Sequence, residues 1–174
     1  MPAIDRSQIV SRGMTPNGLY TVQILEVKNA PAASGTPQTV LELQIVAPAT
    51  VKHGDTTYEV AGTKCEKRTW WSEKAAAKSI EMCADIGLPN ANTAETTEEL
   101  QTALEGLKGM FINALVEGRE RIKRTTPLPG QKPWDAEPVR DENGNVVTDG
   151  WEITNVSFRR GTLRDMDGNY PFSN

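Results

Sequence analysis

Apolar and polar side chains alternate along two segments near the start of the chain. In residues 18–30, Tyr20, Val22 and Ile24 fall on one face of an extended backbone, and polar side chains lie between them. Residues 39–47 repeat this alternation. A period of two is typical of strands with one buried face. Both segments are therefore expected to be half-buried strands, joined by a loop rich in Pro, Gly and Ser.

Further strand patterns follow along the chain. Residues 56–62 and 63–71 indicate two short strands, or one strand bent at Gly62. Residues 110–124 alternate over a longer span, with an apolar even-numbered face and an odd-numbered face that becomes basic along its length. The odd-numbered face is expected to point to solvent. Residues 151–161 predict the last strand.

Two helices are predicted before the long strand. Ser72 is a favourable N-cap for the first helix, which is expected to end at Gly87. Thr96 and Glu99 have the spacing of a capping box for the second helix, which is expected to end at Gly109. Each helix has an apolar stripe with helical spacing, which predicts a face that packs on the core. The stripes are Ala76, Ile80 and Cys83 in the first helix, and Leu100, Ala103, Leu104 and Leu107 in the second.

Residues 125–150 combine four prolines with Trp134 and an Asn143–Gly144 pair. The pair is a strong tight-turn signal, so a long loop containing a small hairpin is expected. From Asp141 onward, oxygen-bearing side chains also follow the spacing of an EF-hand calcium loop. Val146 stands where that loop requires glycine, and the flanks predict strands instead of helices. The hairpin explains the same residues, so no metal site is expected here.

The order of these elements points to one fold class. Three or four strands come first, then helices, then two strands joined by a long loop, so a regular alternation of parallel strands and helices is excluded. We expect a mainly β protein with α-helices: an OB-fold-like, five-stranded antiparallel Greek-key barrel with one or two helices between strands 3 and 4. The expected divisions are an N-terminal arm (1–17), a single OB-like domain (18–164) and a C-terminal tail (165–174).

Composition limits the classes of function. Of the 174 residues, 24 % are charged and 37 % hydrophobic, as in ordinary globular domains. No basic and apolar N-terminal leader or long apolar run is present, so a cytoplasmic location without membrane contact is expected. Cys65 and Cys83 lack companion metal ligands, and His53 is the single histidine. A zinc site, His-based catalysis and cofactor chemistry therefore have little support, and we expect a protein that is not an enzyme.

The net charge of −4 hides an uneven distribution. Residues 64–68, 117–124 and 156–164 carry +2, +2 and +3, so the remainder of the chain carries −11. All three basic segments coincide with expected strands or strand ends. Positive charge is thus concentrated in short segments of an acidic protein, which matters more for binding an anionic polymer than the sum does.

The segment with Trp70 and Trp71 combines bases with aromatic side chains, as single-stranded nucleic-acid sites do. Neighbouring residues of a strand point to opposite faces. If Cys65 points inward, Lys64, Arg68 and Trp70 point outward, and Trp71 points inward beneath the first helix. The alternative is that both tryptophans pack in the core. The candidate nucleic-acid-binding residues are Tyr58, Lys64, Lys67, Arg68, Trp70, Arg119, Arg121, Lys123, Arg124, Trp134, Arg159 and Arg160.

Two of these candidate groups have alternative explanations, and a third is restricted by strand geometry. The bases between 119 and 124 are also what an edge strand uses to stay solvated. Trp134 could clamp a base or pack on the barrel. Arg159 and Arg160 are adjacent, so only one of them can face a given groove.

Residues 18–48, 61–89 and 104–118 resemble small phage-encoded single-stranded DNA-binding proteins with an OB-fold core. The resemblance implies sequence-tolerant binding of single-stranded DNA in phage replication or recombination, in the host cell cytoplasm. Its partners would be single-stranded DNA, further copies of the chain, and replication or recombination proteins. The tail at 165–174 is similar to the acidic Pro-Phe tip of bacterial single-strand binders, but Ser173 and Asn174 follow Phe172.

Two other classes of function remain open. One is a protein-interaction or virion-structural module that uses the same barrel without nucleic acid, which the net acidity favours. The other is an enzyme such as a nuclease, which would need clustered carboxylates. No spacing in the sequence singles out such a cluster.

Overall fold

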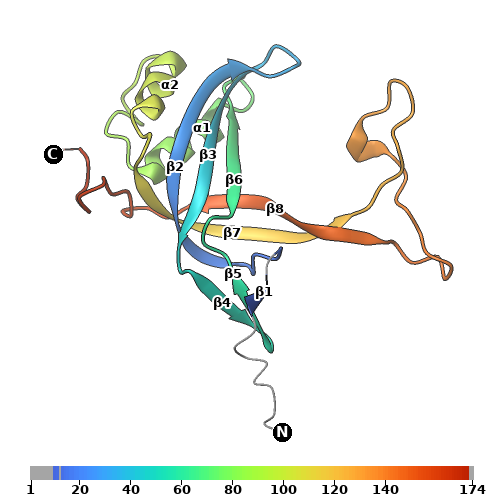
Figure 1. Ribbon diagram of the computed structural model, residues 1–174. Coiled ribbons are helices and arrows are strands. Elements are labelled where there is room, and N and C mark those ends of the chain that lie inside the picture. Colours follow the sequence, from blue (N-terminus) through green and yellow to red (C-terminus); the bar gives the residue numbers. More distant parts are fainter. Residues whose placement is uncertain (1–9, 12, 173–174) are drawn as a thin grey trace, which may run out of the picture.

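The computed structural model describes residues 10–11 and 13–172, which form a mainly β structure with two helices (Figure 1). No helix in this part of the chain is long and apolar enough to cross a bilayer. The strands are β1 (Val10–Ser11), β2 (Gly18–Pro31), β3 (Pro37–Ala47), β4 (Thr50–His53), β5 (Thr56–Glu59), β6 (Lys64–Trp70), β7 (Phe111–Ile122) and β8 (Thr148–Phe158). The helices are α1 (Ala76–Ile86) and α2 (Thr97–Glu105), and a short 3-10 helix spans Pro133–Asp135.

The main sheet has five antiparallel strands in the order β6-β3-β2-β7-β8. The five-stranded antiparallel sheet expected from the sequence is therefore present. Its edges are β6 and β8, and no backbone ladder joins these two strands in the described part of the chain. The closed barrel that we expected is thus not observed, because the sheet stays open between β6 and β8.

Alternating side chains build the core, as their period predicted. Tyr20, Val22 and Ile24 of β2 are all buried. Leu43 in β3 and Ile112 in β7 lie in the same cluster, and both are fully excluded from solvent. β2 pairs with β3 along one edge and with β7 along the other, so its inner face lies at the centre of the sheet.

The segment around Gly62 forms two separate strands, which settles the alternative left open by the sequence. β5 pairs with β4 and β1 in a small three-stranded sheet, whereas β6 joins the main sheet. Gly62 has a φ of 91°, a conformation that side-chain-bearing residues rarely adopt. It therefore permits the change of direction between the two sheets.

Helix α1 begins later than expected. Ser72 does not cap it; instead, the Ser72 carbonyl accepts hydrogen bonds from Ala75 N–H (3.0 Å) and Ala76 N–H (2.8 Å). This turn shifts the start of the helix, and Gly87 ends it with a φ of 102°, as expected. The buried face also differs from the predicted stripe, in which Ala76 and Ile80 are only half-buried. The buried residues are Ser79, Met82, Cys83 and Ile86.

Helix α2 has the expected start and an earlier end. The Glu99 N–H donates to Thr96 Oγ1 at 3.3 Å, which caps the helix, whereas the Glu99 carboxylate accepts from the N–H of Glu95 instead of closing the box on Thr96. The helix stops at Glu105. Gly109, predicted as its end, instead forms the turn into β7, and its N–H donates to the Ile24 carbonyl at 2.7 Å.

The described end of the tail folds back on α1. The Tyr170 hydroxyl donates to the Gly87 carbonyl at 2.6 Å, next to the end of the helix. Phe172 is half-buried against the core and meets the Tyr170 ring edge-on, with the centroids 5.7 Å apart. The aromatic part of the tail is thus bound within the chain, while Ser173 and Asn174 lie outside the described residues.

Candidate nucleic-acid interface

Strand β6 presents two chemically different sides. Lys64, Arg68 and Trp70 are exposed, whereas Thr69 is buried and Lys67 is half-buried. Trp70 is 43 % exposed. The strand parity predicted from the sequence is therefore confirmed for the outward residues, and it separates Lys67 from the other bases of the segment.

Trp71 follows β6 and lies in the core, 5 % exposed. Its Nε1–H donates to Thr39 Oγ1 at 2.8 Å, and its backbone N–H donates to the Pro37 carbonyl at 2.9 Å. The Thr39 hydroxyl in turn donates to Asn29. Trp71 thus fixes the end of β6 to the β2–β3 hairpin and holds Trp70 in its outward position.

The distal parts of β7 and β8, with the connection between them, project from the rest of the molecule as an arm (Figure 1). We call residues 118–151 the β7–β8 arm. Its end divides into a loop that contains the 3-10 helix and a hairpin at Asn143–Gly144, where Asp141 N–H donates to the Asn145 carbonyl at 2.9 Å. The long loop with a small hairpin predicted from the sequence is therefore confirmed.

The bases of the β7–β8 arm are mostly engaged by the arm itself or by Glu152, which adjoins it. Arg119 Nε lies 2.9 Å from Glu152 Oε1, and Arg121 Nε donates to the Asp149 carbonyl at 2.9 Å. Arg124 Nη1 donates to the Ala136 carbonyl at 2.7 Å. No partner within the described chain is found for the Lys123 ammonium. Three guanidinium groups therefore have fixed positions and keep further N–H groups for an external acceptor.

Trp134 lies at the end of the β7–β8 arm and is 65 % exposed. It does not pack on the sheet, which was one alternative from the sequence. Lys132 Nζ lies 5.3 Å from the centre of the indole ring, within cation–π distance. The arm thus presents an aromatic surface with a positive charge beside it.

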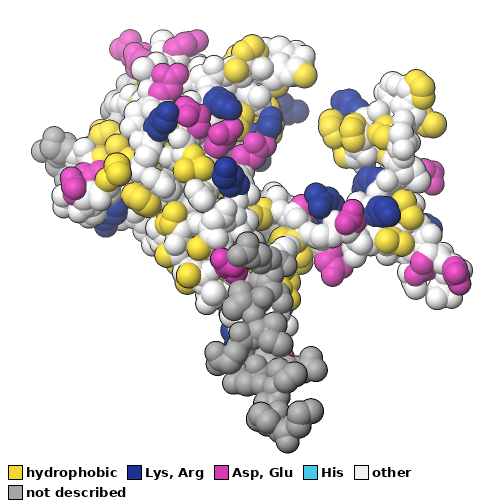
Figure 2. Space-filling model, in the orientation of Figure 1, with side chains coloured by type: hydrophobic (Ala, Val, Ile, Leu, Met, Phe, Trp, Pro, Cys, Tyr) yellow, Lys and Arg dark blue, Asp and Glu magenta, His cyan; other side chains and the backbone are white. Residues whose placement is uncertain are grey.

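Figure 2 shows a deep notch between the main body and the β7–β8 arm, and β6 lies on the side of the body that borders this notch (Figure 1). Lys and Arg side chains occur on both sides of the notch, with Asp and Glu side chains among them. The exposed side of β6 and the β7–β8 arm are therefore the two parts of the candidate interface.

Four of the sequence-predicted residues lie apart from this interface. Tyr58 belongs to β5 and packs against the core. Arg159 and Arg160 follow the end of β8, and Arg160 Nε lies 2.6 Å from Asp85 Oδ1 on α1. Lys67 points to the other side of its strand, into a cavity between β6, α1 and β8.

Sequence reasoning missed this cavity and its second lysine, Lys78 on α1. One signal was present: Lys67 alternates with Cys65 and Thr69 on the inward face of β6, where a charged side chain is unusual. Burial lowers the pKa of the Lys67 ammonium, since a low-dielectric environment disfavours the charged form.

The two cysteines have no environment that would activate them. Burial raises the pKa of the Cys65 thiol to about 11 and that of Cys83 to about 12. Both thiols thus stay protonated at neutral pH, and a thiolate nucleophile is not available. Among residues 10–11 and 13–172, no group of three or more His, Cys, Asp and Glu side chains is arranged to hold a metal ion.

Comparison with known proteins assigns the chain to no family. No protein-family profile matches the chain, and no curated protein matches it significantly.

Proposed function

We propose that this protein is a non-catalytic, sequence-tolerant single-stranded DNA-binding protein that serves phage replication or recombination. The observation that carries the proposal is the outward face of β6. There Lys64, Arg68 and Trp70 are exposed on an edge strand that borders the notch. An aromatic platform flanked by cations is the combination that binds unstacked bases and their phosphates.

The strand order supports an OB-fold core for this function. Numbered along the chain within the main sheet, the strands lie in the order 3-2-1-4-5. That is the order of an OB-fold barrel opened between strands 3 and 5, and α1 and α2 fall between strands 3 and 4. The β7–β8 arm then corresponds to the loop between strands 4 and 5, which OB-folds use to contact oligonucleotides.

In the proposed mechanism, a base stacks on Trp70 while Lys64 and Arg68 lie near the adjoining phosphates. Lys123 and the outer N–H groups of Arg119 contact phosphates from the opposite side of the notch. Trp134 offers a second stacking surface at the end of the arm. Every base has a π-face, so this binding tolerates any sequence. Release of counterions from the phosphates makes it sensitive to salt.

One set of contacts favours the second class of function. Arg68 Nε lies 2.7 Å from Glu66 Oε1, and Arg119 is paired with Glu152. Partial neutralisation of bases is what a protein-interaction or virion-structural module without nucleic acid would show. These pairs are exposed, however, so replacing a carboxylate by a phosphate costs little, because exposed ion pairs contribute only about 0–1 kcal/mol.

Titration of a fluorescent single-stranded oligo-dT at low salt tests the proposal. We expect Trp70→Ala to weaken binding by about 1–3 kcal/mol. Combined substitution of Arg119, Arg121 and Lys123 by Glu is expected to abolish tight binding and to reduce the salt dependence. The matched control replaces Lys52, Lys74 and Lys108, which lie outside the interface, by Glu.

Each outcome of this titration is informative. Loss of binding with the interface triple variant, and not with the control, supports the proposal. Equal losses with both triple variants would show that only net charge matters, and absence of binding by the wild-type protein at low salt would overturn the proposal. Binding of another protein that survives the interface triple variant would favour the interaction module instead.

A further inference from the structure

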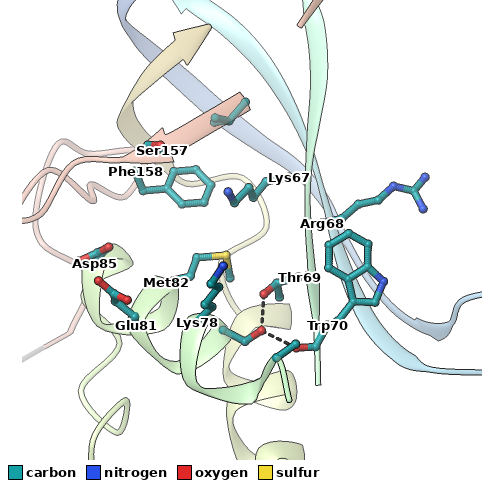
Figure 3. Close-up of a pocket in the computed structure, with 13 residues that line it drawn as sticks. Lys67, Arg68, Thr69, Trp70, Lys78, Glu81, Met82, Asp85, Ser157 and Phe158 are labelled. Carbon is teal, nitrogen blue, oxygen red and sulfur yellow. Dashed lines mark hydrogen bonds between the residues drawn. The ribbon is translucent and has the colours of Figure 1, made fainter. Parts of the chain in front are cut away.

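A cavity of about 440 Å³ lies where the main sheet is open. One wall is β6, the second is α1 and the third is the end of β8, represented by Phe158 (Figure 3). The volume falls in the range of roughly 300–1,000 Å³ that small-molecule sites occupy. The gap between the two edge strands is therefore large enough for a ligand.

Two ammonium groups enter this cavity from different elements. Figure 3 shows the side chains of Lys67 from β6 and Lys78 from α1 with their amino ends pointing into the cavity, close to Met82 and Phe158. Within the described residues, neither ammonium group has a hydrogen-bond or ion-pair partner. Burial lowers the pKa of Lys67, which has no anion to compensate the loss of water. The cavity thus brings together two positive charges, one on the half-buried Lys67 and one on the exposed Lys78.

The walls that carry the lysines are fastened to each other. The hydroxyl groups of Thr69 on β6 and Ser79 on α1 form a hydrogen bond, and Ser79 Oγ also donates to the Trp70 carbonyl at 2.6 Å. Thr69 and Trp70 lie within three residues of Lys67, and Ser79 is next to Lys78. The strand and the helix that carry the lysines are therefore fixed relative to each other, which reduces the entropy lost on binding.

The other charged groups around the cavity do not neutralise the lysines directly. Asp85 is paired with Arg160, and Arg68 is paired with Glu66. Glu81 is exposed on α1, and β8 contributes only the uncharged Val156, Ser157 and Phe158. Figure 3 shows Glu81 and Asp85 on the opposite side of the cavity from Trp70 and Arg68. An anion is therefore favoured next to Lys67 and Lys78 and is repelled by Glu81 and Asp85.

We propose that this cavity binds the phosphate monoester of a nucleotide, with Lys67 and Lys78 on the phosphate and with Phe158 and Met82 against the attached nucleoside. A phosphate monoester carries a charge of about −1.5 to −2 at pH 7, which matches two ammonium groups better than a carboxylate does. Phe158 and Met82 are each 8 % exposed and form an apolar wall of the cavity against which the nucleoside would pack.

This site is separate from the outward face on which the proposed function rests. The side chains of Arg68 and Trp70 lie on the other side of β6 from the half-buried Lys67, although all three line the cavity together with the exposed Lys78. The phosphate monoester can come from two sources, a free mononucleotide or the phosphorylated end of a DNA strand that crosses Trp70. Binding of a mononucleotide would remain even if the outward face binds no DNA.

The first experiment compares dTMP with thymidine by calorimetry and by ¹H–¹⁵N NMR of the intact protein. We expect dTMP, and not thymidine, to bind and to shift the amide signals of Lys67, Lys78 and Phe158. Lys67→Met and Lys78→Met should each weaken this binding about tenfold, as expected for loss of a charge-assisted contact. Lys74→Met, on the turn before α1 and outside the cavity, is the control and should bind as the wild type does.

A second experiment needs no variant. Lysines of the wild-type protein are acetylated with a water-soluble ester and quantified by mass spectrometry. We expect dTMP to protect Lys67 and Lys78, and not Lys74, whereas thymidine and acetate protect none of them.

Comparison of dT oligomers with and without a terminal phosphate distinguishes the two sources. Protection by dTMP assigns a mononucleotide site, and protection only by phosphorylated oligomers assigns a strand-end site. The proposal is overturned if neither protects the two lysines, or if acetate protects them as well as dTMP does. Loss of oligo-dT binding in Trp70→Ala with dTMP binding retained would show that the two sites are independent.

Discussion

Trp70 and Trp71 are neighbours in sequence, but the first side chain is open to solvent and the second is buried and hydrogen-bonded to Thr39. The division follows from the strand period of two, because consecutive side chains of an extended backbone point to opposite faces. One residue can therefore contact a ligand while its neighbour holds the strand in place.

Trp71→Ala is expected to lower the free energy of unfolding by about 3–5 kcal/mol, because it removes a large buried side chain. Trp71→Phe should cost less, since it mainly loses the hydrogen bond to Thr39, worth about 1 kcal/mol. Urea denaturation followed by circular dichroism measures both. Trp70→Ala is the matched control and should change the free energy of unfolding by less than about 1 kcal/mol. Equal effects at the two positions would contradict this assignment.

Gly118 is expected to tolerate no side chain, because Trp151 and Glu152 of β8 lie against it. A Cβ atom at this position would lie 2.4 Å from Trp151 Nε1 and 2.6 Å from the Glu152 carbonyl oxygen. Gly118→Ala should therefore destabilise the protein by about 1–3 kcal/mol through overpacking.

The control for this prediction is Gly18→Ala in β2, where the nearest atom to the new Cβ, Tyr20 Cε2, would be 3.9 Å away. Thermal unfolding of both variants gives the comparison. A melting temperature for Gly118→Ala that equals that of Gly18→Ala would show that β7 and β8 separate more easily at the base of the arm than their packing implies.

The native thiols are expected to resist alkylation. With its pKa raised to about 11 by burial, Cys65 is a thiolate in only about one molecule in a thousand at pH 8. Cys83 is still less ionised. Reaction with iodoacetamide at pH 8, followed by mass spectrometry, should be slow in the folded protein and fast in urea. Rapid modification of folded protein would mean that β6 or α1 opens on the timescale of the reaction.

Lys67→Met is expected to raise the free energy of unfolding at pH 7. Burial lowers the pKa of Lys67 in the folded state, so the folded protein carries an unfavourable charge at every pH below that value. The penalty disappears as the pH rises through the folded pKa toward the unfolded value of about 10.4. Denaturation at pH 7 and at a pH above the unfolded value should thus show a smaller stability difference between variant and wild type at the higher pH. A difference that grows with pH would contradict the sign of this shift.

The local patterns of the sequence were sufficient to predict most of the strands of the main sheet. The alternation in β2, β3 and β7 can be recognised within the sequence of each strand alone. The outward position of Trp70 can be predicted from the inward position of Cys65 in the same strand. The start of α1 could not be predicted, because Ser72 has the residue type of a cap but uses its carbonyl in a preceding turn.

The relations between distant elements were not accessible from the sequence. The cavity arises because β6 and β8 do not pair, and Lys78 becomes part of it only when α1 packs beside them. The pairing of Arg119 with Glu152 likewise depends on the register of β7 and β8. Charge counts along the chain could locate the basic segments but could not show which bases already have a carboxylate.

The open edge of β6 has a consequence for self-association. An unpaired edge strand can add a strand from another copy, and a charged side chain that points inward is one means by which natural proteins prevent this. Lys67 has that position on β6, with Lys64 and Arg68 on the other side. Lys67→Met therefore removes a barrier to edge-to-edge aggregation while it relieves a buried charge. Light scattering at high protein concentration should show this variant associating more readily than Lys67→Arg, even where its isolated fold is the more stable.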